Sequence, residues 1–367
     1  MSVGIDLPGF EPTREYTSTI LSSASDIARL DDDVNRLMPD RDVSLSPQFA
    51  LASVDASWSP RVAVVSRRSA VAGVVFGKER WVAGVPTGVI YADGRLGHLT
   101  VSNGDDCEAI LLTAIRSWFA MPRIRGVRLA IAPSSPEANV IERTAATMRL
   151  DVTRATPAEY EMHSALPLPS SYEAFVTSLG AQTRHNFRYY RRRFEAAGHR
   201  FVENLPPREV EEILLQLRMK SQIPFSAARM RTAARRVMST DQPWAAALRH
   251  ANGDYLSVTA GWFDRGRAIL LLQQNNDIEF SQASLSVVLR GYLIETLIAR
   301  RVPELLIWSG AAAPLSRYVK PLPAISVYFD ARTFGWRMIR RMVGGMQRFA
   351  GRRVSSELRW VALPGTN

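Results

Sequence analysis

A polar segment between an apolar run and a helical stretch has residues suited to binding an anion. The apolar run ends in the polar residues 273–277, and the small residues from Ser281 to Ser286 lead into a stretch with helical periodicity. At such a strand-to-helix junction, the first N–H groups of the helix have no partner within the helix, and the helix dipole attracts negative charge. We therefore predict that Ser284 and Ser286 bind a phosphate or pyrophosphate, with Arg290 one turn further along. The alternative is that one of these serines only caps the helix.

Two carboxylates in the same segment are candidates for acid–base chemistry. Asp277 and Glu279 directly follow the apolar run, close in sequence to the predicted phosphate loop. A carboxylate at such a position could accept the proton that an attacking amine or hydroxyl loses. The alternative is that both are ordinary loop residues.

A strongly basic helical segment comes earlier in the chain. Phe187, Tyr190 and Phe194 recur at helical spacing and form a stripe that can pack on a core. Three arginines share a neighbouring face: Arg184, Arg188 and Arg191. Like charges at this spacing repel each other, and an anionic partner would offset the repulsion. We predict that these arginines bind the substrate. The alternative is a solvated face that Glu residues of the next helix neutralise.

A second basic stretch, residues 334–353, lies near the C-terminus. Trp336, Ile339, Val343 and Met346 line one side of it, and most of its arginines lie elsewhere. A basic amphipathic helix of this kind can bind an anionic membrane surface. The alternative is a terminal helix that packs on its own domain.

The remaining candidates for chemistry are few. The five histidines, at positions 98, 163, 185, 199 and 250, show no spacing typical of metal ligands, so we expect no metal site. The single cysteine, Cys107, excludes a disulfide framework and has no evident His partner in the sequence. The sequence contains neither the GxSxG motif of a serine nucleophile nor a P-loop motif.

Composition indicates a soluble protein of two domains. The 367 residues are 46% hydrophobic and 22% charged, which is enough for a full core. Lys and Arg number 46 against 35 Asp and Glu, a formal net charge of +11. Such an excess, mostly of Arg, suits a phosphate-bearing partner, although a GC-rich genome would also produce it. With neither a signal peptide nor an apolar run of membrane-spanning length, we predict a cytoplasmic protein with peripheral contact at the inner face of the membrane through 334–353.

The pattern of apolar residues predicts two similar halves. In the first half a helix over 107–119 and a strand over 127–132 follow a set of short strands, over 61–66, 71–76, 81–85, 88–91 and 98–101. In the second half, helices over 178–197 and 227–238 precede three strands with tight turns, over 244–250, 255–263 and 268–274. A helix over 286–300 and a buried strand over 304–308 follow. The shared order indicates a structural duplication and an α+β fold, with mixed, mainly antiparallel sheets flanked by helices.

Several segments together resemble a known family. The segment from Ser178 to Gly198, SLGAQTRHNFRYYRRRFEAAG, resembles a segment of the GNAT-related acyltransferases found in cellulose and exopolysaccharide biosynthesis. Those enzymes are similar to the FemAB-like, or Fem-type, aminoacyl ligases of peptidoglycan bridge synthesis. The segments NDIEFSQASLSVVL from Asn276 and ELLIWSG from Glu304 resemble a second segment of that family, and Tyr318-Val319-Lys320 resembles a Tyr-Lys pair that follows it.

The resemblance implies two tandem GNAT-like folds, residues 1–165 and 166–367, with the donor site in the second. It implies transfer of an acyl group from acyl-CoA, either acetyl-CoA or a longer thioester, to an amine or hydroxyl of a sugar, a peptide or another small metabolite. The residues that would bind the donor are Ser284, Ser286, Arg290 and Lys320. The catalytic residues would be Asp277, Glu279 and Tyr318, and the acceptor would bind to Arg184, Arg188 and Arg191.

Two other functions remain open. A tRNA-dependent aminoacyl ligase of the Fem type would take aminoacyl-tRNA as its donor, with the arginines from Arg184 to Arg193 against the acceptor stem. The long charged helical hairpin that Fem-type ligases carry for tRNA is not evident in the sequence. A non-catalytic protein on the same scaffold would use its basic segments only to bind anions or a membrane.

Overall fold

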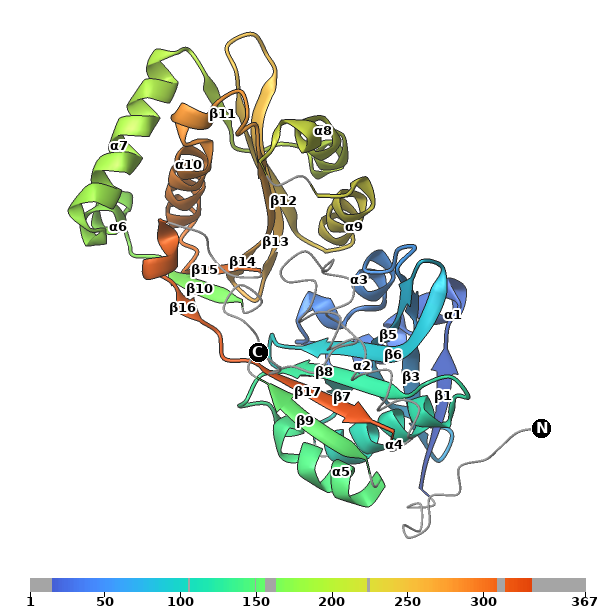
Figure 1. The fold of residues 1–367 in the computed structure, drawn as a ribbon. Coiled ribbons are helices and arrows are strands. Elements are labelled where there is room, and N and C mark those ends of the chain that lie inside the picture. The colour runs from blue at the N-terminus through green and yellow to red at the C-terminus, as the bar shows by residue number, and fades with distance from the viewer. Residues whose placement is uncertain are drawn as a thin grey trace, which may run out of the picture. The chain divides into compact units, whose positions relative to one another are not determined.

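The computed structural model describes residues 15–104, 106–148, 150–155, 163–222, 225–308 and 314–331. These residues form two compact units (Figure 1), the first drawn from Met1–Pro157 and Pro323–Asn367 and the second from Ala158–Leu322. The division expected from the sequence, 1–165 and 166–367, differs from this one at the C-terminal end, because the strand that follows Leu322 completes a sheet of the first unit. The stretch 334–353 lies outside the described residues.

The described residues of the first unit form two sheets. The smaller sheet is antiparallel and has the order β1 (Tyr16–Leu21), β3 (Val62–Arg67), β4 (Ala70–Val75) and β7 (Thr100–Ser102). The larger sheet has the order β2 (Trp58–Pro60), β5 (Gly77–Val82), β6 (Val85–Gly94), β8 (Gly126–Ile131), β17 (Ile325–Asp330) and β9 (Asp151–Ala155). Strands β6 and β8 are parallel, and the other neighbours in this sheet are antiparallel.

Helix α4 (Cys107–Ala120) supplies the centre of the first core. Its apolar residues recur at helical spacing, so that Ile110, Ala114 and Trp118 share one face and are fully buried. As predicted, this helix follows a set of strands and leads into the buried strand β8. Further helices in the described part of this unit are α1 (Ala24–Ala28), α2 (Asp31–Leu37), η1 (Val43–Leu45), α3 (Pro47–Ala52), η2 (Pro136–Asn139) and α5 (Ile141–Met148).

The second unit is built on one mixed sheet, to which its described residues contribute seven strands. Their order is β11 (Arg200–Val202), β12 (Pro243–Arg249), β13 (Tyr255–Asp264), β14 (Arg267–Asn275), β15 (Glu304–Ile307), β10 (Ser164–Pro167) and β16 (Lys320–Pro321). Strands β14 and β15 are parallel, and the other neighbours are antiparallel. The predicted turn joins β13 to β14, and Arg265 and Gly266 have φ of 47° and 76°, as a type I′ turn requires.

Helices cover both faces of this sheet (Figure 1). One face carries α6 (Tyr172–Ser178), α7 (Ala181–Ala196) and α10 (Leu285–Ala299), and the other carries α8 (Val210–Leu217) and α9 (Ala227–Met238). The 3₁₀ turns between elements are η4 (Pro207–Glu209), η5 (Arg218–Lys220), η6 (Ser281–Ala283) and η7 (Leu315–Arg317). Helix α9 has the bounds predicted from the sequence. The Ser226 hydroxyl caps it by accepting a hydrogen bond from the Arg229 N–H at 3.2 Å.

A bulge between β13 and β14 requires a glycine. The register of the pair shifts between Ala260 and Gly261. A Cβ atom at position 261 would lie 1.7 Å from the carbonyl oxygen of Ile269, so only glycine fits without a movement of the backbone. Gly261 therefore allows the two strands to approach closely at this point.

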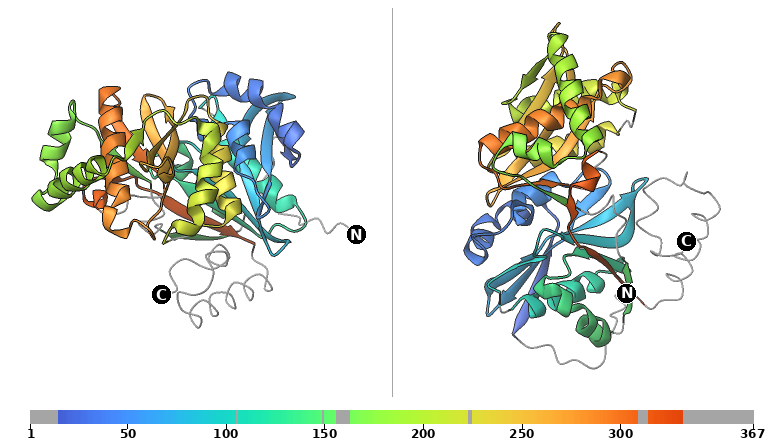
Figure 2. Two further views of the ribbon diagram at one scale, coloured as in Figure 1. Left: turned by 90° about the horizontal axis from the view of Figure 1, so that it is seen from above. Right: turned by 90° about the vertical axis from the view of Figure 1, so that its left-hand side faces the viewer.

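One strand from the C-terminal part of the chain belongs to a sheet of the first unit. Strand β10 follows the first unit in the chain but pairs with β15 and β16 in the second. Strand β17, drawn in red in Figure 2, follows the second unit but lies between β8 and β9 in the first, with Val327 opposite both Leu129 and Arg154. The chain therefore passes between the units twice.

The duplication predicted from the sequence is confirmed in the arrangement of strands and helices. Each unit contains a parallel strand pair whose second strand follows a helix: β6 and β8 with α4, and β14 and β15 with α10. The mixed, mainly antiparallel sheets flanked by helices are also confirmed. No helix within the described ranges is both long and apolar enough to cross a membrane.

Candidate functional site

Strand β14 extends beyond the segment over which it pairs with β15 among the described residues. The two strands pair from Ala268 to Leu270, opposite Leu305 to Ile307, and the Trp308 N–H donates to the carbonyl oxygen of Leu270 at 2.9 Å. Beyond Leu270, β14 continues to Asn275 and pairs only with β13 among the described residues. One edge of β14 from Leu271 to Asn275 thus has no strand partner among the described residues, and we call this edge the opening beside β14. An extended ligand with amide groups could form hydrogen bonds there, as a further strand would.

An aromatic cluster lies where the described pairing of β14 with β15 ends, at Trp308. The ring of His163 is 4.3 Å from the ring of Trp308, centre to centre, and Trp308 is 5.6 Å from Trp262. His163 comes directly before β10, whose Ser164 pairs with Ile307, so it stands beside Trp308 across the β10–β15 pair. His163 and Trp262 are buried. Sequence patterns did not indicate this cluster, because its members come from three strands far apart in the chain.

The first turn of α10 lies at the edge of the sheet where β14 ends. Ser284 has a left-handed φ of 45°, and its carbonyl oxygen accepts hydrogen bonds from Val287 and Val288 at 2.9 and 3.2 Å. The N–H groups of Leu285 and Ser286 have no hydrogen-bond acceptor within the described part of the chain. Two such donors at the positive end of the helix dipole can bind a phosphate group. The structure therefore brings Ser284 and Ser286 to the position that the sequence predicted.

Arg290 lies one turn further along α10 and reaches back toward β14. Its Nε donates to Oε1 of Gln273 at 2.9 Å. Burial lowers the pKa of Arg290 to about 10, because a charged guanidinium is poorly solvated there. The side chain still carries its charge at neutral pH. A partly buried cation between α10 and β14 raises the electrostatic potential beside the opening, which favours an anionic ligand.

The two candidate carboxylates of the loop differ in their surroundings. Hydrogen bonds from Asn276 (2.6 Å) and Lys220 lower the pKa of Glu279, and its ion pair with Lys220 has an N–O distance of 3.2 Å. Glu279 thus ties the loop to η5. Burial raises the pKa of Asp277, against a smaller opposite effect of its hydrogen bond with Asn275. The two pKa values thus shift in opposite directions, and burial makes Asp277 a better proton acceptor than an ordinary aspartate.

Tyr318 lies at the N-terminal end of α7. Its hydroxyl donates to Thr183 Oγ1 at 3.4 Å and accepts from the Gly180 N–H at 2.8 Å, and these bonds lower the pKa of Tyr318. Only the C-terminal end of α7, around Phe194, packs against Leu285 and the first turns of α10. At a rise of about 1.5 Å per residue, Gly180 and Phe194 are roughly 20 Å apart. The structure therefore does not bring Tyr318 to the first turn of α10.

Lys320 is also separated from the predicted phosphate loop. It begins β16 at the edge of the sheet and pairs with Ala165 of β10, which in turn pairs with Leu306 of β15. Two strand spacings of about 4.8 Å each separate Lys320 from β15. Its side chain is exposed. The resemblance grouped Lys320 with Ser284 and Ser286 because their segments follow one another in the sequence. In the structure, Lys320 lies apart from these two serines.

The arginines predicted to bind substrate form hydrogen bonds with neighbouring groups of the protein. Arg184 donates to the carbonyl oxygen of Thr177 (3.3 Å), and Arg188 to Glu173 of α6 (2.8 Å). Arg191 bonds to Glu195 (3.0 Å) and Glu295 (2.7 Å). Burial alone would lower the pKa of Arg191, but these two carboxylates raise it above its ordinary range. Carboxylates of α6, of α7 itself and of α10 thus neutralise much of this face, whereas the alternative interpretation of the sequence expected them on the next helix.

Two histidines that the sequence left without a role come together beside the loop. The rings of His199 and His250 are 4.5 Å apart, and the ring of Phe280 is 6.3 Å from the first and 5.7 Å from the second. Burial, and then the charge of His250, lower the pKa of His199. Across the parts of the chain that the structure describes, no three side chains of His, Cys, Asp or Glu converge on a metal site.

Comparisons with known proteins identify the fold. No protein-family model and no curated protein sequence matches the chain. Among solved structures, the chain is similar to FemX, with 9% identity, a TM-score of 0.59, and coverage of 88% of this chain and 99% of that one. It is also similar to L-PGS from Bacillus licheniformis, with 12% identity, a TM-score of 0.51, and coverage of 88% and 97%.

A third similar structure is the C-terminal domain of a putative lysylphosphatidylglycerol synthetase from Agrobacterium fabrum, with 12% identity, a TM-score of 0.52, and coverage of 89% of this chain and 97% of that one. These likenesses extend over both units. The chain therefore has two tandem GNAT-like folds, as the resemblance in the sequence implied.

Proposed function

We propose that the second unit transfers an acyl group from acyl-CoA to an amine or hydroxyl of a sugar, a peptide or another small metabolite. One observation carries this proposal. The edge of β14 that has no described strand partner lies beside the first turn of α10, where two helix N–H groups and the partly buried cation of Arg290 come together. A donor with phosphate groups and a long arm containing amides suits this combination, because the phosphates can bind to the helix while the arm lies along β14.

In this proposal, different described residues have different roles in binding the donor. The N–H groups of Leu285 and Ser286, with the hydroxyls of Ser284 and Ser286, bind the donor phosphates. Arg290 offsets their charge from within the unit. Glu279 forms an ion pair with Lys220, and it therefore repels the donor phosphates less than an unpaired carboxylate would. The acyl carbonyl then lies at the base of the opening, near Trp308.

Catalysis in this proposal rests mainly on positioning. The nitrogen or oxygen of the acceptor forms a bond to the carbonyl carbon, the carbon–sulfur bond breaks, and the thiol of the donor leaves. Asp277 follows β14 and lies about 16 Å or more from Leu270 along the strand, so it does not reach the base of the opening. We assign the proton that the acceptor loses to His163, the titratable side chain beside Trp308. Holding two reactants in register can supply a large share of the rate enhancement.

Calorimetric titration with acetyl-CoA and with palmitoyl-CoA tests the donor site. Binding of either thioester to the wild type is expected, and the preferred chain length indicates the acyl class. Ser286→Asp places a carboxylate against the phosphates and should abolish binding. The control is Ser316→Asp, which adds the same charge at an exposed serine of η7 and should bind as the wild type does. Equal binding by both variants, or none by the wild type, would overturn the assignment.

An aminoacyl ester of tRNA is the second candidate for the donor. The basic face of α7 favours it, since Arg188 is half exposed and Arg192 and Arg193 are exposed. One similar structure is named a putative lysylphosphatidylglycerol synthetase, and aminoacyl transfer is the function that this likeness suggests. Binding of charged tRNA that weakens steeply with added salt, without affinity for acyl-CoA, would favour this donor. Vesicle binding that depends on 334–353, with no affinity for either donor, would favour the non-catalytic alternative.

A further inference from the structure

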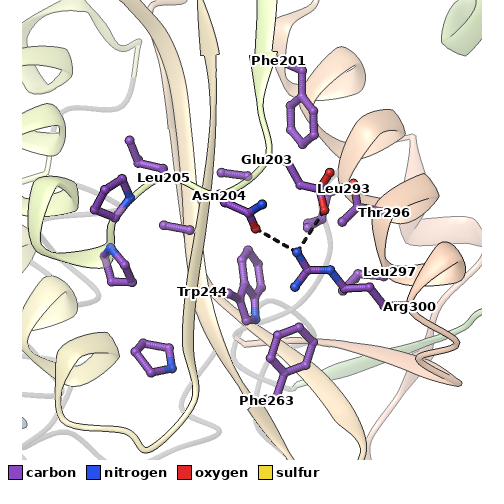
Figure 3. Close-up of a pocket in the computed structure, with 15 residues that line it drawn as sticks. Phe201, Glu203, Asn204, Leu205, Trp244, Phe263, Leu293, Thr296, Leu297 and Arg300 are labelled. Atoms are coloured by element: carbon purple, nitrogen blue, oxygen red, sulfur yellow. Dashed lines mark hydrogen bonds and ion pairs between the residues drawn. The ribbon is translucent and has the colours of Figure 1, made fainter.

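A pocket of about 260 Å³ lies in the second unit, outside the candidate donor site. Four parts of the chain line it: residues 201 and 203–207, the beginning of β12, Phe263 of β13, and the last turns of α10 with Arg300 just after them (Figure 3). Ser286 and Arg300 are 14 positions apart on and just after α10, about 20 Å at its helical rise. Strand β13 also separates β12 from β14. A ligand here would not occupy the opening beside β14.

The interior of the pocket is apolar and aromatic. The rings of Trp244 and Phe263 are 6.5 Å apart, and Leu293 and Leu297 of α10 lie opposite them. Trp244 is 9% exposed, and its indole Nε1 has no hydrogen-bond partner among the described residues. The volume is near the lower end of the range for small-molecule sites, about 300–1,000 Å³. It suits a single amino-acid side chain rather than a nucleotide or a coenzyme.

The rim of the pocket holds one charge of each sign. Nη2 of Arg300 donates to Oε1 of Glu203 at 2.9 Å and to Oδ1 of Asn204 at 2.8 Å. Figure 3 shows both side chains pointing toward Arg300, beside the rings of Trp244 and Phe263. The paired side chains are 39% and 45% exposed, so water screens the ion pair and it stabilises the fold little. A ligand can therefore separate the pair at a small energetic cost.

We propose that this pocket binds a zwitterionic amino acid with a large apolar side chain. Its carboxylate bonds to Nε and Nη1 of Arg300, which have no described partner, and its ammonium group bonds to Glu203 and to the amide oxygen of Asn204. Its side chain lies against Trp244 and Phe263. The charged residues that line the pocket are Glu203 and Arg300, so the rim is neutral and favours a ligand with both charges over a simple anion.

Titration with L-phenylalanine tests the chemistry of the ligand. N-acetyl-L-phenylalanine lacks the ammonium group, and L-phenylalanine amide lacks the carboxylate. Each should bind about tenfold more weakly than the parent, because one charge-assisted contact is lost. The indole N–H resonance of Trp244, assigned through Trp244→Phe, should shift with L-phenylalanine. No binding of L-phenylalanine, or equal binding of all three compounds, would overturn the proposal.

Variants test the place of binding. Arg300→Gln and Glu203→Gln should each weaken L-phenylalanine binding about tenfold. Thr296→Phe fills the pocket from α10 and should abolish it. The matched control is Arg231→Gln, because Arg231 is also an exposed arginine (57%), paired with Glu211 at 3.5 Å, but does not line the pocket. If Thr296→Phe does not fold, L-phenylalanine binding by Arg300→Gln tests the assignment instead. Unchanged binding in Arg300→Gln would overturn the assignment.

Discussion

The phenol of Tyr292 donates a 2.6 Å hydrogen bond to Oε1 of Glu195 and so joins α10 to the C-terminal half of α7. The same oxygen accepts a hydrogen bond from Arg191, whose guanidinium carbon lies 4.2 Å from the centre of the Tyr292 ring. The bond from Tyr292, and then that from Arg191, lower the pKa of Glu195. These three side chains hold α7 against the helix whose first turn forms the candidate donor site.

Removal of the Tyr292 hydroxyl should weaken this junction. We expect Tyr292→Phe to lower the free energy of unfolding by about 1–2 kcal/mol at neutral pH, because a hydrogen bond to a charged group is lost. The ring stays stacked on Phe201, at 4.7 Å and 6°. Since the folded pKa of Glu195 is depressed, its stabilisation is complete above the ordinary carboxyl pKa and is lost as pH falls through the depressed value. The difference between the proteins should therefore shrink in acid.

Urea unfolding at neutral and acid pH measures this difference. The control is Tyr189→Phe, because Tyr189 is 40% exposed and its hydroxyl accepts a hydrogen bond from Arg193 at 3.3 Å. It should change the free energy of unfolding by less than about 0.5 kcal/mol. An equal loss in the two variants would contradict the role of Tyr292.

The arginines of α7 should separate into structural and surface residues. We expect Arg191→Gln to lower the free energy of unfolding by about 1–3 kcal/mol, because Glu195 and Glu295 lose a shared charged partner. Arg192→Gln should have almost no effect, since Arg192 is exposed and its Nε donates to the Arg188 carbonyl oxygen at 3.3 Å. Thermal and urea unfolding compare the two. If Arg191→Gln unfolds as the wild type does but loses ligand binding, the result would support the predicted role of Arg191 in substrate binding.

The pKa of His199 should depend on the neighbouring His250. Because the folded pKa of His199 lies below its ordinary value, the unfolded chain takes up this proton first as pH falls. Stability is therefore lost on acidification through the ordinary histidine pKa toward the depressed one. We expect His250→Gln to raise the pKa of His199, because the charge of His250 is one of the two causes of the depression. An NMR titration of the His199 ring resonances in the wild type and the variant measures it, and an unchanged pKa would contradict the effect of His250.

The bulge beside the candidate site should tolerate no side chain. We expect Gly261→Ala to lower the free energy of unfolding by about 3 kcal/mol or more, because the new Cβ meets the Ile269 carbonyl oxygen. Gly253→Ala is the control, since a Cβ atom at this turn position would have no atom within 4 Å, and the φ of 102° is then the source of strain. Its loss should be about 1–2 kcal/mol. Similar losses in the two variants would show that close approach of the strands is not the cause.

The sequence predicted local structure well where periodicity and turn residues agree. The helix expected over 286–300 is α10, Leu285–Ala299, and the strands on each side of Arg265-Gly266 have nearly the expected bounds. Neither β10 nor β17 was predicted as a strand. Both are short, and a pattern of apolar residues does not indicate which sheet a strand joins. The return of β17 to the first unit is therefore evident only in the structure.

The candidate site was predictable in part for the same reason. Ser286 and Arg290 are one turn apart on a single helix, so their proximity follows from the spacing. The contact of His163 with Trp308 depends on the pairing of β10 with β15, which sequence separation conceals. In the same way, spacing placed Arg188 on one face of α7 but could not show that Glu173 of α6 would meet it.

The position of β17 has a consequence for synthesis of the protein. Arg128 of β8 and Ser326 of β17 share a hydrogen bond but are 198 residues apart in the chain. At about 5–20 residues per second, the ribosome needs roughly 10–40 s to make the residues between them. During that time β8 and β9 have been translated without the strand that separates them, and each has an edge able to pair with another chain. A nascent chain that stops before Ile325 would keep these edges exposed and become a substrate for chaperones and proteases.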